Sequence, residues 1–303
     1  MGFVLNSLTG AFTLAFVLTS MFGLGLGLTV REIVEPLTAP GLTIRALVAN
    51  FVIVPAVAWG LARLFALDQD LGTGLVLMGT VAGAPLALKA TQIAHGDVRF
   101  AVGLVTLQVV ASVIYLPLVL PWLIPGIAVD AVALAIPLVL QVLLPLALGL
   151  VMHVRYDEEA AMARPIMSEI ASISLAALLV LNLVNLRQVL ALLGTGAIAA
   201  ATGVTVLALA AGYLLGGPGR ASRRALALGT GQRNFAAAFV IAEGSFADRP
   251  TVMLMLLAAS LLSLALVMLA AGELGRRVKA RGALEGDVSV AGASRVSAGR
   301  AGA

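Results

Sequence analysis

Gly229-Thr230-Gly231-Gln232-Arg233-Asn234 is the most informative segment of this chain. It lies in the middle of an apolar run, approximately Ala221 to Gly244, which is long enough to cross a lipid bilayer. The two glycines loosen a helix, and three polar residues follow them directly. A charged side chain at mid-membrane costs from about 3 to more than 10 kcal/mol. We therefore expect Arg233 to face water or protein rather than lipid, and to serve a function.

A second run, from Leu71 to Ala94, has the same design. It is interrupted at Gly83-Ala84-Pro85 and carries Lys89 a few residues later. Two interrupted spans that each hold one cation are typical of the broken, crossing helices of a secondary transporter. The residues that we expect to break these helices are Gly83, Pro85, Gly229 and Gly231.

Composition sets the class of protein. The chain is 61% hydrophobic and 11% charged, with a mean hydropathy of +1.08, and a soluble domain of 303 residues could not bury so much apolar surface. It is therefore predicted to be an all-α polytopic membrane protein in a lipid bilayer. The absence of cysteine excludes disulfide and thiolate chemistry. The net charge of +4 is attributed to the orientation of loops, not to nucleic-acid binding.

Nine apolar stretches have the length of membrane spans. They cover approximately Leu8–Leu28, Ala46–Leu67, Leu71–Ala94, Val98–Leu120, Ala128–Val151, Ile166–Leu186, Val189–Leu215, Ala221–Gly244 and Thr251–Leu274. We interpret 1–275 as one transmembrane domain with two inverted halves, about 1–125 and 160–275. A charged loop is expected over Arg155–Arg164, and a disordered cytoplasmic tail over 276–303. Alternating glycines over Gly23–Leu28 indicate close helix contact.

The distribution of Lys and Arg predicts the orientation. If the C-terminus is cytoplasmic, twelve basic residues lie inside, and only Arg63, Arg187 and Arg249 lie outside. We therefore expect the N-terminus outside and the C-terminus in the cytoplasm, in a bacterial inner membrane.

Polar residues within the spans are the candidates for substrate binding: Lys89, Arg233, Asn234, Gln232, Asn50, Thr91, Gln92 and Gln108. No acid lies within a span at the depth of the two cations, so water or a bound anion must compensate them. Simpler interpretations stay open. Lys89 lies near a span end and could extend to the interface. The amides could join helices or satisfy backbone groups freed by the breaks.

Catalytic and metal-binding patterns are missing from the sequence. Every aspartate falls in a loop or in the tail, and there is no His-Glu-x-x-His motif and no nucleophile elbow. His95 and His153 lie in predicted loops, and we assign a metal to neither. The chain is therefore not expected to be an enzyme.

Several motifs, in their order and spacing, resemble those of the bile acid:sodium symporter family. The family's Gln-Phe-x-x-x-Pro pattern is similar to Asn50–Pro55, and its Thr-x-x-Ala-x-Gly-Asn/Asp motif matches Thr91–Asp97. Its Glu-x-Gly-x-Gln-Asn motif matches Gly229–Asn234 in part. The resemblance extends from Met21 to about Leu264, and it implies a nine-span member that lacks the first helix of the ten-span form.

The chain departs from the family at the residues that the resemblance assigns to sodium. Family members hold two sodium ions with a Glu, a Ser-Asn pair, hydroxyl groups on the following helix and an amide. The corresponding positions here are Gly229, Ala87 with Leu88, Ala101 with Val105, and Arg233. The sequence therefore predicts that sodium is not bound in the family's manner, and that no other cofactor or metal takes part.

Three hypotheses for function remain. The first is a secondary active transporter of a small organic anion, with Lys89 and Arg233 as its charge partners. The second is a proton-coupled form of it, in which Lys89 changes protonation during the cycle. The third is a membrane sensor or ligand-binding scaffold that moves nothing; the short tail, which is too small to be a signalling domain, weighs against it.

Overall fold

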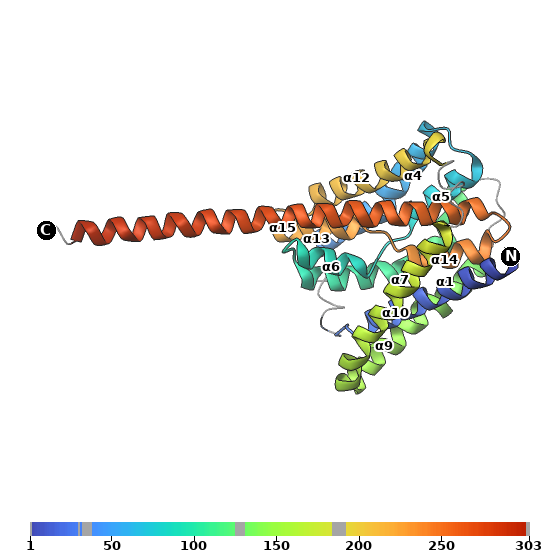
Figure 1. Cartoon of the computed structure of the whole chain (residues 1–303), viewed down its shortest axis with the longest axis horizontal. Helices are drawn as coiled ribbons and strands as arrows, with labels where there is room; N and C mark the ends of the chain where they lie inside the picture. Colours follow the sequence, from blue (N-terminus) through green and yellow to red (C-terminus); the bar gives the residue numbers. More distant parts are fainter. Residues whose placement is uncertain (1, 30, 32–37, 125–130, 184–191, 301–303) are drawn as a thin grey trace.

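All secondary structure in the described residues of the computed structural model is helical; these residues are 2–29, 31, 38–124, 131–183 and 192–300. The elements of the first half are α1 (Gly2–Gly25), α3 (Pro40–Val48), η2 (Ala49–Ile53), α4 (Val54–Leu64), α5 (Gln69–Thr80), α6 (Leu86–Ile93) and α7 (Val98–Leu123). Those that follow are α8 (Ala131–Leu138), η3 (Val139–Leu143), α9 (Leu144–Arg155), α10 (Asp157–Leu183), η4 (Leu192–Gly194), α12 (Ala197–Leu215), α13 (Arg220–Gly231), α14 (Phe235–Ser245) and α15 (Pro250–Arg300). They form one bundle, from which the end of α15 projects (Figure 1).

Six helices in the described part of the chain are long and apolar enough to cross a membrane. They are Pro40–Leu64, Val98–Leu123, Leu134–Arg155, Asp157–Leu178, Ala197–Leu215 and Pro250–Ala280. A shorter apolar segment, Gly10–Gly25, and the two interrupted helices accompany them. The prediction of an all-α polytopic membrane protein is therefore confirmed, whereas the count of nine spans stays a prediction.

Both helices are interrupted, but the second break lies after its glycines: Gly229 is inside α13, and the break covers 232–234. The first interrupted helix ends at Thr80 and resumes at Leu86, with Gly83 at a φ of +84° that only glycine adopts without strain. A Cβ at Gly83 would also lie 2.6 Å from the backbone nitrogen of Val109, so α7 could not approach a larger residue. The second helix ends at Gly231 and resumes at Phe235.

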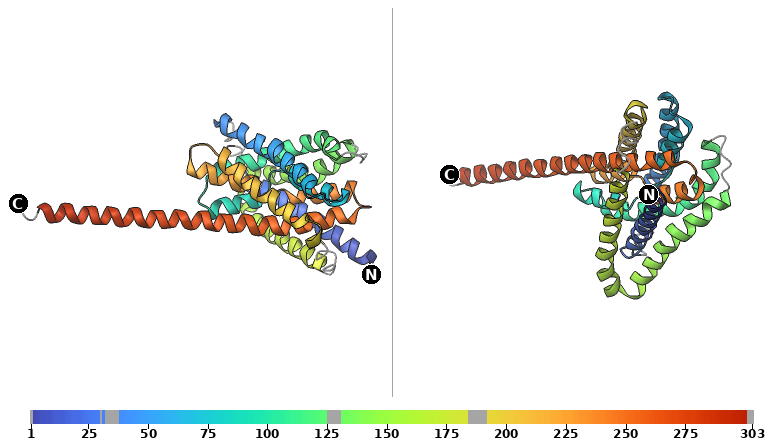
Figure 2. Two further views of the ribbon diagram at one scale, coloured as in Figure 1. Left: turned by 90° about the horizontal axis from the view of Figure 1, so that it is seen from above. Right: turned by 45° about the vertical axis from the view of Figure 1, so that its right-hand side comes forward.

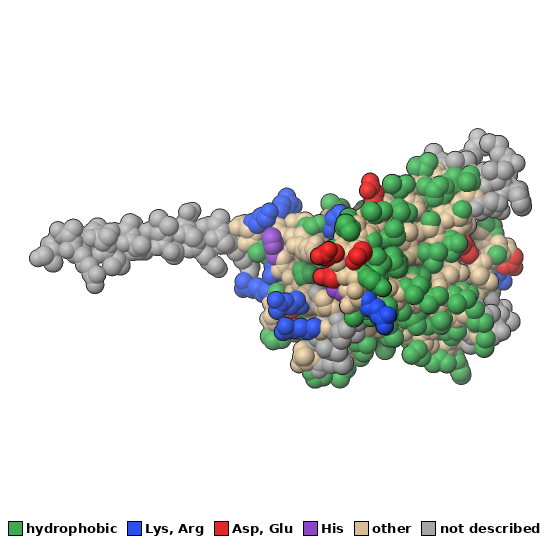
Figure 3. Space-filling view, turned by 90° about the horizontal axis from the view of Figure 1, so that it is seen from below, with side chains coloured by type: hydrophobic (Ala, Val, Ile, Leu, Met, Phe, Trp, Pro, Cys, Tyr) green, Lys and Arg blue, Asp and Glu red, His purple; other side chains and the backbone are tan. Residues whose placement is uncertain are grey.

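The two interrupted helices run side by side at one end of the molecule. There α6 packs against α13: Ala90 and Ala94 share an apolar cluster with Leu228, and the Asp97 amide donates a hydrogen bond to the Ala221 carbonyl at 3.2 Å. The same end holds Gly275 of α15, and we call it the basic end. Figure 3 shows Lys and Arg side chains gathered where α15 leaves the bundle. At the opposite end, Arg249 and Asp70 form an ion pair at 3.4 Å.

Close contact between glycines joins α1 to α9. A Cβ added to Gly25 would lie 2.2 Å from the Leu146 carbonyl oxygen, and one added to Gly149 would lie 2.3 Å from the Phe22 carbonyl oxygen. The predicted close contact at the glycine-rich end of the first span is therefore confirmed. Together with α10, these helices lie beside the part of the bundle that contains the breaks (Figure 2).

Two expectations about segment boundaries were wrong. The predicted charged loop over Arg155–Arg164 is helical, because α9 ends at Arg155 and α10 begins at Asp157. Three acidic residues occupy the first turn of α10, where negative charge is favourable next to the positive end of the helix dipole. The turn expected from Pro121 onward begins later, because α7 continues through Pro121 to Leu123.

The tail also differs from the prediction of disorder over 276–303. In the structure α15 continues as a helix to Arg300 and projects beyond the bundle (Figures 1 and 2). Where α15 leaves the bundle, Arg276 and Arg277 each form a hydrogen-bonded ion pair with Glu273, one turn earlier. Such pairs stabilise a helix.

We predict that Gly25→Ala destabilises the protein by ~1–3 kcal/mol, because the new methyl group meets the α9 backbone. The matched control is Gly60→Ala in α4, where an added Cβ meets nothing within 4 Å. Replacing a helical glycine without a clash is stabilising by roughly 0.5–1 kcal/mol. Thermal unfolding of both purified variants should therefore shift in opposite directions, and equal shifts would contradict the close contact.

Candidate functional site

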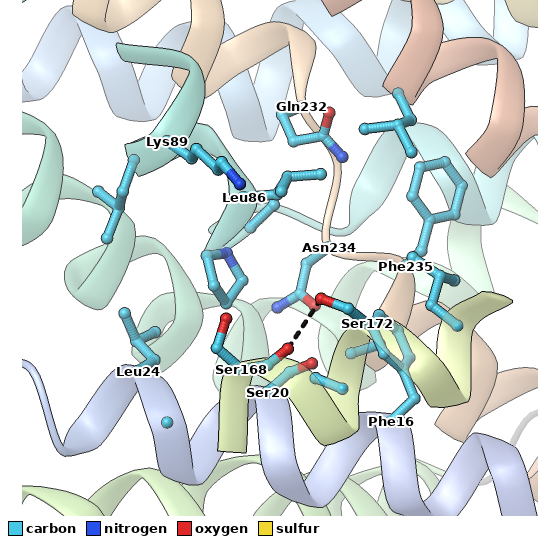
Figure 4. A pocket seen from close by; sticks show the side chains of 18 of the residues that line it. Phe16, Ser20, Leu24, Leu86, Lys89, Ser168, Ser172, Gln232, Asn234 and Phe235 are labelled. Atoms are coloured by element: carbon cyan, nitrogen blue, oxygen red, sulfur yellow. Dashed lines mark hydrogen bonds between the residues drawn. The ribbon is translucent and has the colours of Figure 1, made fainter. Parts of the chain in front are cut away.

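A cavity of about 420 Å³ lies between the helix breaks and the layer formed by α1 and α10. Its lining comes from α1, α6, α10, α14 and α15, together with both breaks. The lining residues are Phe16, Thr19, Ser20, Gly23, Leu24, Ala84, Pro85, Leu86, Leu88, Lys89, Gln92, Arg164, Ser168, Ala171, Ser172, Leu175, Gln232, Arg233, Asn234, Phe235, Ala236, Ser260, Leu261 and Leu264. Figure 4 shows this cavity from close by.

The lining of the cavity has a one-sided charge. Lys89, Arg164 and Arg233 are its charged residues, and no aspartate or glutamate is among the described residues that line it. Most of the other lining residues are apolar or carry a small hydroxyl group. The cavity is therefore suited to a small molecule with an apolar body and a negatively charged group.

Lys89 projects into this cavity from α6. Its side chain is exposed, and Figure 4 shows the ammonium group directed over Leu86 toward the middle of the cavity. Gln92, which follows one turn later, is exposed and also lines the cavity. Lysine carries a compact, strongly hydrated charge on a flexible stem. Lys89 therefore lines the cavity, as Arg233 does.

Gln232 and Asn234 bring unpartnered polar atoms to the wall of the cavity. Both side chains are at least 95% buried, and Gln232 Oε1 and Asn234 Nδ2 have no hydrogen-bond partner. The other end of the Asn234 amide is occupied, because Asn234 Oδ1 accepts a hydrogen bond from the Ala237 amide at 3.2 Å and thereby caps α14. Unpartnered polar atoms that are buried beside a cavity are suited to hydrogen-bond a ligand.

Two helix N-termini meet at the same cavity. The segment Ala84–Leu86 starts α6, and Asn234–Ala236 starts α14, and all of these residues are in the lining. The N-terminus of a helix carries a partial positive charge of about half an elementary charge. Because both N-termini lie against the cavity, their dipoles add to the charge of Lys89 and favour an anion there.

Arg233 contributes to the lining, but its guanidinium group donates four hydrogen bonds to protein oxygen atoms. Nε donates to the Met78 carbonyl at 3.2 Å, and Nη2 donates to the Gly79 carbonyl at 2.7 Å. Nη1 donates to Asn50 Oδ1 at 2.8 Å and to the Thr230 carbonyl at 3.1 Å. The side chain is 1% exposed. Lys89 and Arg233 therefore share one cavity, but only Lys89 extends its charge into it.

Three other candidates from the sequence lie outside the lining. Asn50 is completely buried and binds Arg233, and its Nδ2 also donates to Thr230 Oγ1 at 3.1 Å. Thr91 turns its hydroxyl back to the Ala87 carbonyl within α6. Gln108 is buried in α7, and neither atom of its amide has a partner. Asn50 therefore binds Arg233 and does not line the cavity. The structure offers no explanation for the unpartnered amide of Gln108.

Sequence reasoning missed the contribution of α10 to the site. Arg164, Ser168 and Ser172 line the cavity, and Figure 4 shows both serines on the side opposite Lys89. Arg164 was missed because Arg155–Arg164 is predicted as a loop, and the two serines because small hydroxyl residues within a span give no distinct signal. The three acidic residues at the start of α10 were the available signal for a helix. Arg164 also needs Gly27, because a Cβ there would lie 2.4 Å from the Arg164 Cζ.

We predict that a cysteine at position 89 or 92 reacts with a water-soluble thiol reagent, whereas one at position 91 does not. Lys89 and Gln92 are exposed to the cavity, while Thr91 is completely buried on the same helix and serves as the matched control. Because the natural chain has no cysteine, single variants carry no background reactivity. Labelling of Thr91→Cys at the rate of Lys89→Cys would contradict the side chain placement in α6.

Comparison with known proteins bears on the family of this chain. A model described as "Sodium Bile acid symporter family" matches residues 13–195, which is more than half of the chain. The probable sodium/metabolite cotransporter BASS3 of Arabidopsis thaliana chloroplasts is 29% identical over 195 residues, which cover 64% of this chain and 45% of that protein. The sodium-dependent transporter YocS of Bacillus subtilis, described as uncharacterized, is 27% identical over 205 residues, which cover 65% and 60%.

A third relative, the probable sodium/metabolite cotransporter BASS1 of Arabidopsis thaliana chloroplasts, is 25% identical over 247 residues, or 80% of this chain. The chain spans between 45% and 62% of the length of these three curated relatives. The family model covers the second half of α1 and both parts of the first interrupted helix, and it reaches Thr195, just before α12. The chain belongs to the sodium bile acid symporter family.

Proposed function

We propose that this protein is a secondary active transporter that carries a small organic anion through the cavity between the breaks and α10. The observation that carries this proposal is the charge of the cavity: three basic residues and no acidic one among the described lining residues. Two helix N-termini at the same wall supply further positive potential. The names of the relatives, a probable sodium/metabolite cotransporter and a sodium-dependent transporter, support a transport function.

Lys89 is proposed as the main charge partner of the anion, with Gln92, Gln232 and Asn234 as hydrogen-bonding neighbours. An organic anion also needs an apolar environment for its body, and Leu24, Leu175 and Leu261 are among the side chains that offer one. The volume of about 420 Å³ is in the range of sites for small molecules and limits the size of this body.

The residues of this chain do not fit the sodium sites that the family implies. The side chains at the corresponding positions, such as Gly229, Ala87 and Val105, contain no oxygen atom that could bind a cation. Arg233 replaces the amide, and its guanidinium takes four oxygen acceptors for itself. These observations support transport that does not depend on sodium at those positions, and we derive no step that involves sodium.

The proposed orientation follows from the charges at the basic end. Arg223 at this end donates to the Gly217 carbonyl at 2.6 Å, and the tail leaves the bundle from the same end. Arg63 and Arg249 belong to the opposite end, while Arg187 lies outside the described residues. By the positive-inside rule we place the basic end in the cytoplasm. Lys89 and Gln92, near the end of α6, would then bind the anion from the cytoplasmic half of the membrane.

We predict that Lys89→Gln raises the half-saturation concentration for anion uptake roughly 10- to 100-fold, as expected when a charge-assisted contact of about 1.5–3 kcal/mol is lost. The matched control is Lys279→Gln, because Lys279 is the other lysine of the chain and lies outside the cavity. The measurement is uptake of radiolabelled carboxylates of increasing size into proteoliposomes. Unchanged uptake by Lys89→Gln would contradict the assignment of the charge partner.

The same proteoliposomes test the coupling ion. Uptake should be equal with an inward gradient of sodium and of potassium, since the sodium positions lack oxygen ligands. An imposed pH gradient tests the proton-coupled form. Uptake that requires sodium would contradict the proposal of a sodium-independent member.

We also predict the sidedness of the loops. A reporter that is active only in the cytoplasm should be active when it is fused after Gly219 or after Ala280, and inactive after Asp248, which precedes α15 at the opposite end. Enzymatic activity of the three fusions in intact cells is the measurement. A reversed pattern would show that the basic end faces outward.

A further inference from the structure

The C-terminal ends of two helices converge on one buried point. α5 ends at Thr80 and α13 ends at Gly231. The last carbonyl groups of a helix have no partner within it, and the C-terminal end carries a partial negative charge. Three such carbonyls, those of Met78, Gly79 and Thr230, accept hydrogen bonds from Arg233. The guanidinium therefore lies where two negative helix ends meet.

Asn50 completes this set of oxygen atoms from a third segment. It lies in the π-turn η2, which precedes Pro55, a residue that has no N–H to donate. Asn50 Nδ2 donates to the Ala46 carbonyl at 3.0 Å and to Thr230 Oγ1 at 3.1 Å. These two bonds orient the amide so that its oxygen is directed at Arg233, 2.8 Å away.

All four acceptors of Arg233 are electrically neutral. Within the described residues no carboxylate forms an ion pair with its guanidinium. A buried charge that is neutralised by carbonyl and amide oxygens, not by an acid, has the environment of a bound cation. In broken-helix transporters, unwound carbonyls and the C-terminal ends of half-helices are the groups that bind a free cation.

We propose that Arg233 is a resident cation: its guanidinium fills a cation-binding site, made by Met78, Gly79, Thr230 and Asn50, that joins the two interrupted helices. The donor–acceptor distances of 2.7–3.2 Å are those of N–H···O hydrogen bonds. The site is therefore shaped for a planar cation with several N–H donors. Because the cation is part of the chain, it cannot leave this site as a free ion would.

This proposal extends the proposed function, but its test does not require transport. The variant Arg233→Ala removes the guanidinium and leaves four buried acceptors without a donor. Its melting temperature in detergent should fall by roughly 5 to 10 °C. Arg220→Ala, at an exposed position at the start of the same α13, is the matched control and should melt like the wild type.

Rescue by a free cation distinguishes a cation site from ordinary packing. Methylguanidinium, at a concentration too low to unfold the wild type, should restore part of the lost melting temperature of Arg233→Ala. It should not stabilise the wild type, whose site is filled, or Arg220→Ala. Tetramethylammonium at equal concentration has the charge but no N–H donor, and it should rescue nothing. Absence of rescue by methylguanidinium, or equal rescue by tetramethylammonium or sodium, overturns the proposal.

Two further variants keep the test decisive if Arg233→Ala does not fold. Arg233→Lys retains a cation with fewer donors, whereas Arg233→Met retains a long side chain without charge. The proposal requires the lysine variant to melt above the methionine variant. The reverse order, or equal melting temperatures, would show that Arg233 contributes by packing alone. Because all of these readouts are thermal, a failed transport assay would leave this result unaffected.

Discussion

A helix that breaks within a membrane exposes backbone carbonyl and amide groups that lipid cannot satisfy. This chain breaks two helices, at 81–85 and at 232–234, and it brings the breaks together. Arg233 satisfies carbonyl groups at both breaks, because it donates to Met78 and Gly79 near the end of α5 and to Thr230 near the end of α13. The Asn234 side chain meets part of the amide side by capping α14. These few hydrogen bonds connect the two breaks to each other and to α14.

The two breaks also place helix ends of opposite partial charge in different places. Where α5 and α13 end, two partial negative charges lie close together, and Arg233 compensates them within the protein. Where α6 and α14 begin, two partial positive charges lie against the cavity, and nothing acidic among its described lining residues compensates them. The same pair of interruptions thus produces a site that is already occupied by a cation and a neighbouring site that is suited to an anion. The proposed function uses the second site and depends on the first for its shape.

The parts of this arrangement that are local in the sequence could be predicted from it. Gly83 with Pro85 predicted the first break, whereas the second break follows Gly229 and Gly231, which lie at the end of α13. The direction of the Arg233 guanidinium could not be predicted, because its acceptors Met78 and Gly79 lie more than 150 positions away in the chain.

The contribution of α10 to the cavity could not be predicted for a different reason. Arg155–Arg164 is rich in charge, which is typical of a loop between spans, but acidic residues at a helix N-terminus stabilise the helix as well. The helix continues through this segment and carries Arg164 to the cavity. The first turn of α15 past the apolar residues is similar, because Glu273 pairs with Arg276 and Arg277 there, and such local pairs stabilise a helix.

The chemistry of the two cations explains why one is arginine and the other lysine. The acceptors around Arg233 are fixed by backbone and by Asn50, and they lie in several directions, which suits a planar fork of five N–H donors. A lysine there has only three donors on one atom and would leave part of the helix ends unpartnered. Lys89 instead faces an open volume in which its partner must arrive and leave. A flexible stem with a hydrated point charge can follow such a partner, while a guanidinium held by many bonds would stay where it is. The residue that joins the breaks and the residue that is proposed to bind the anion therefore have opposite requirements, and the chain meets each with the side chain suited to it.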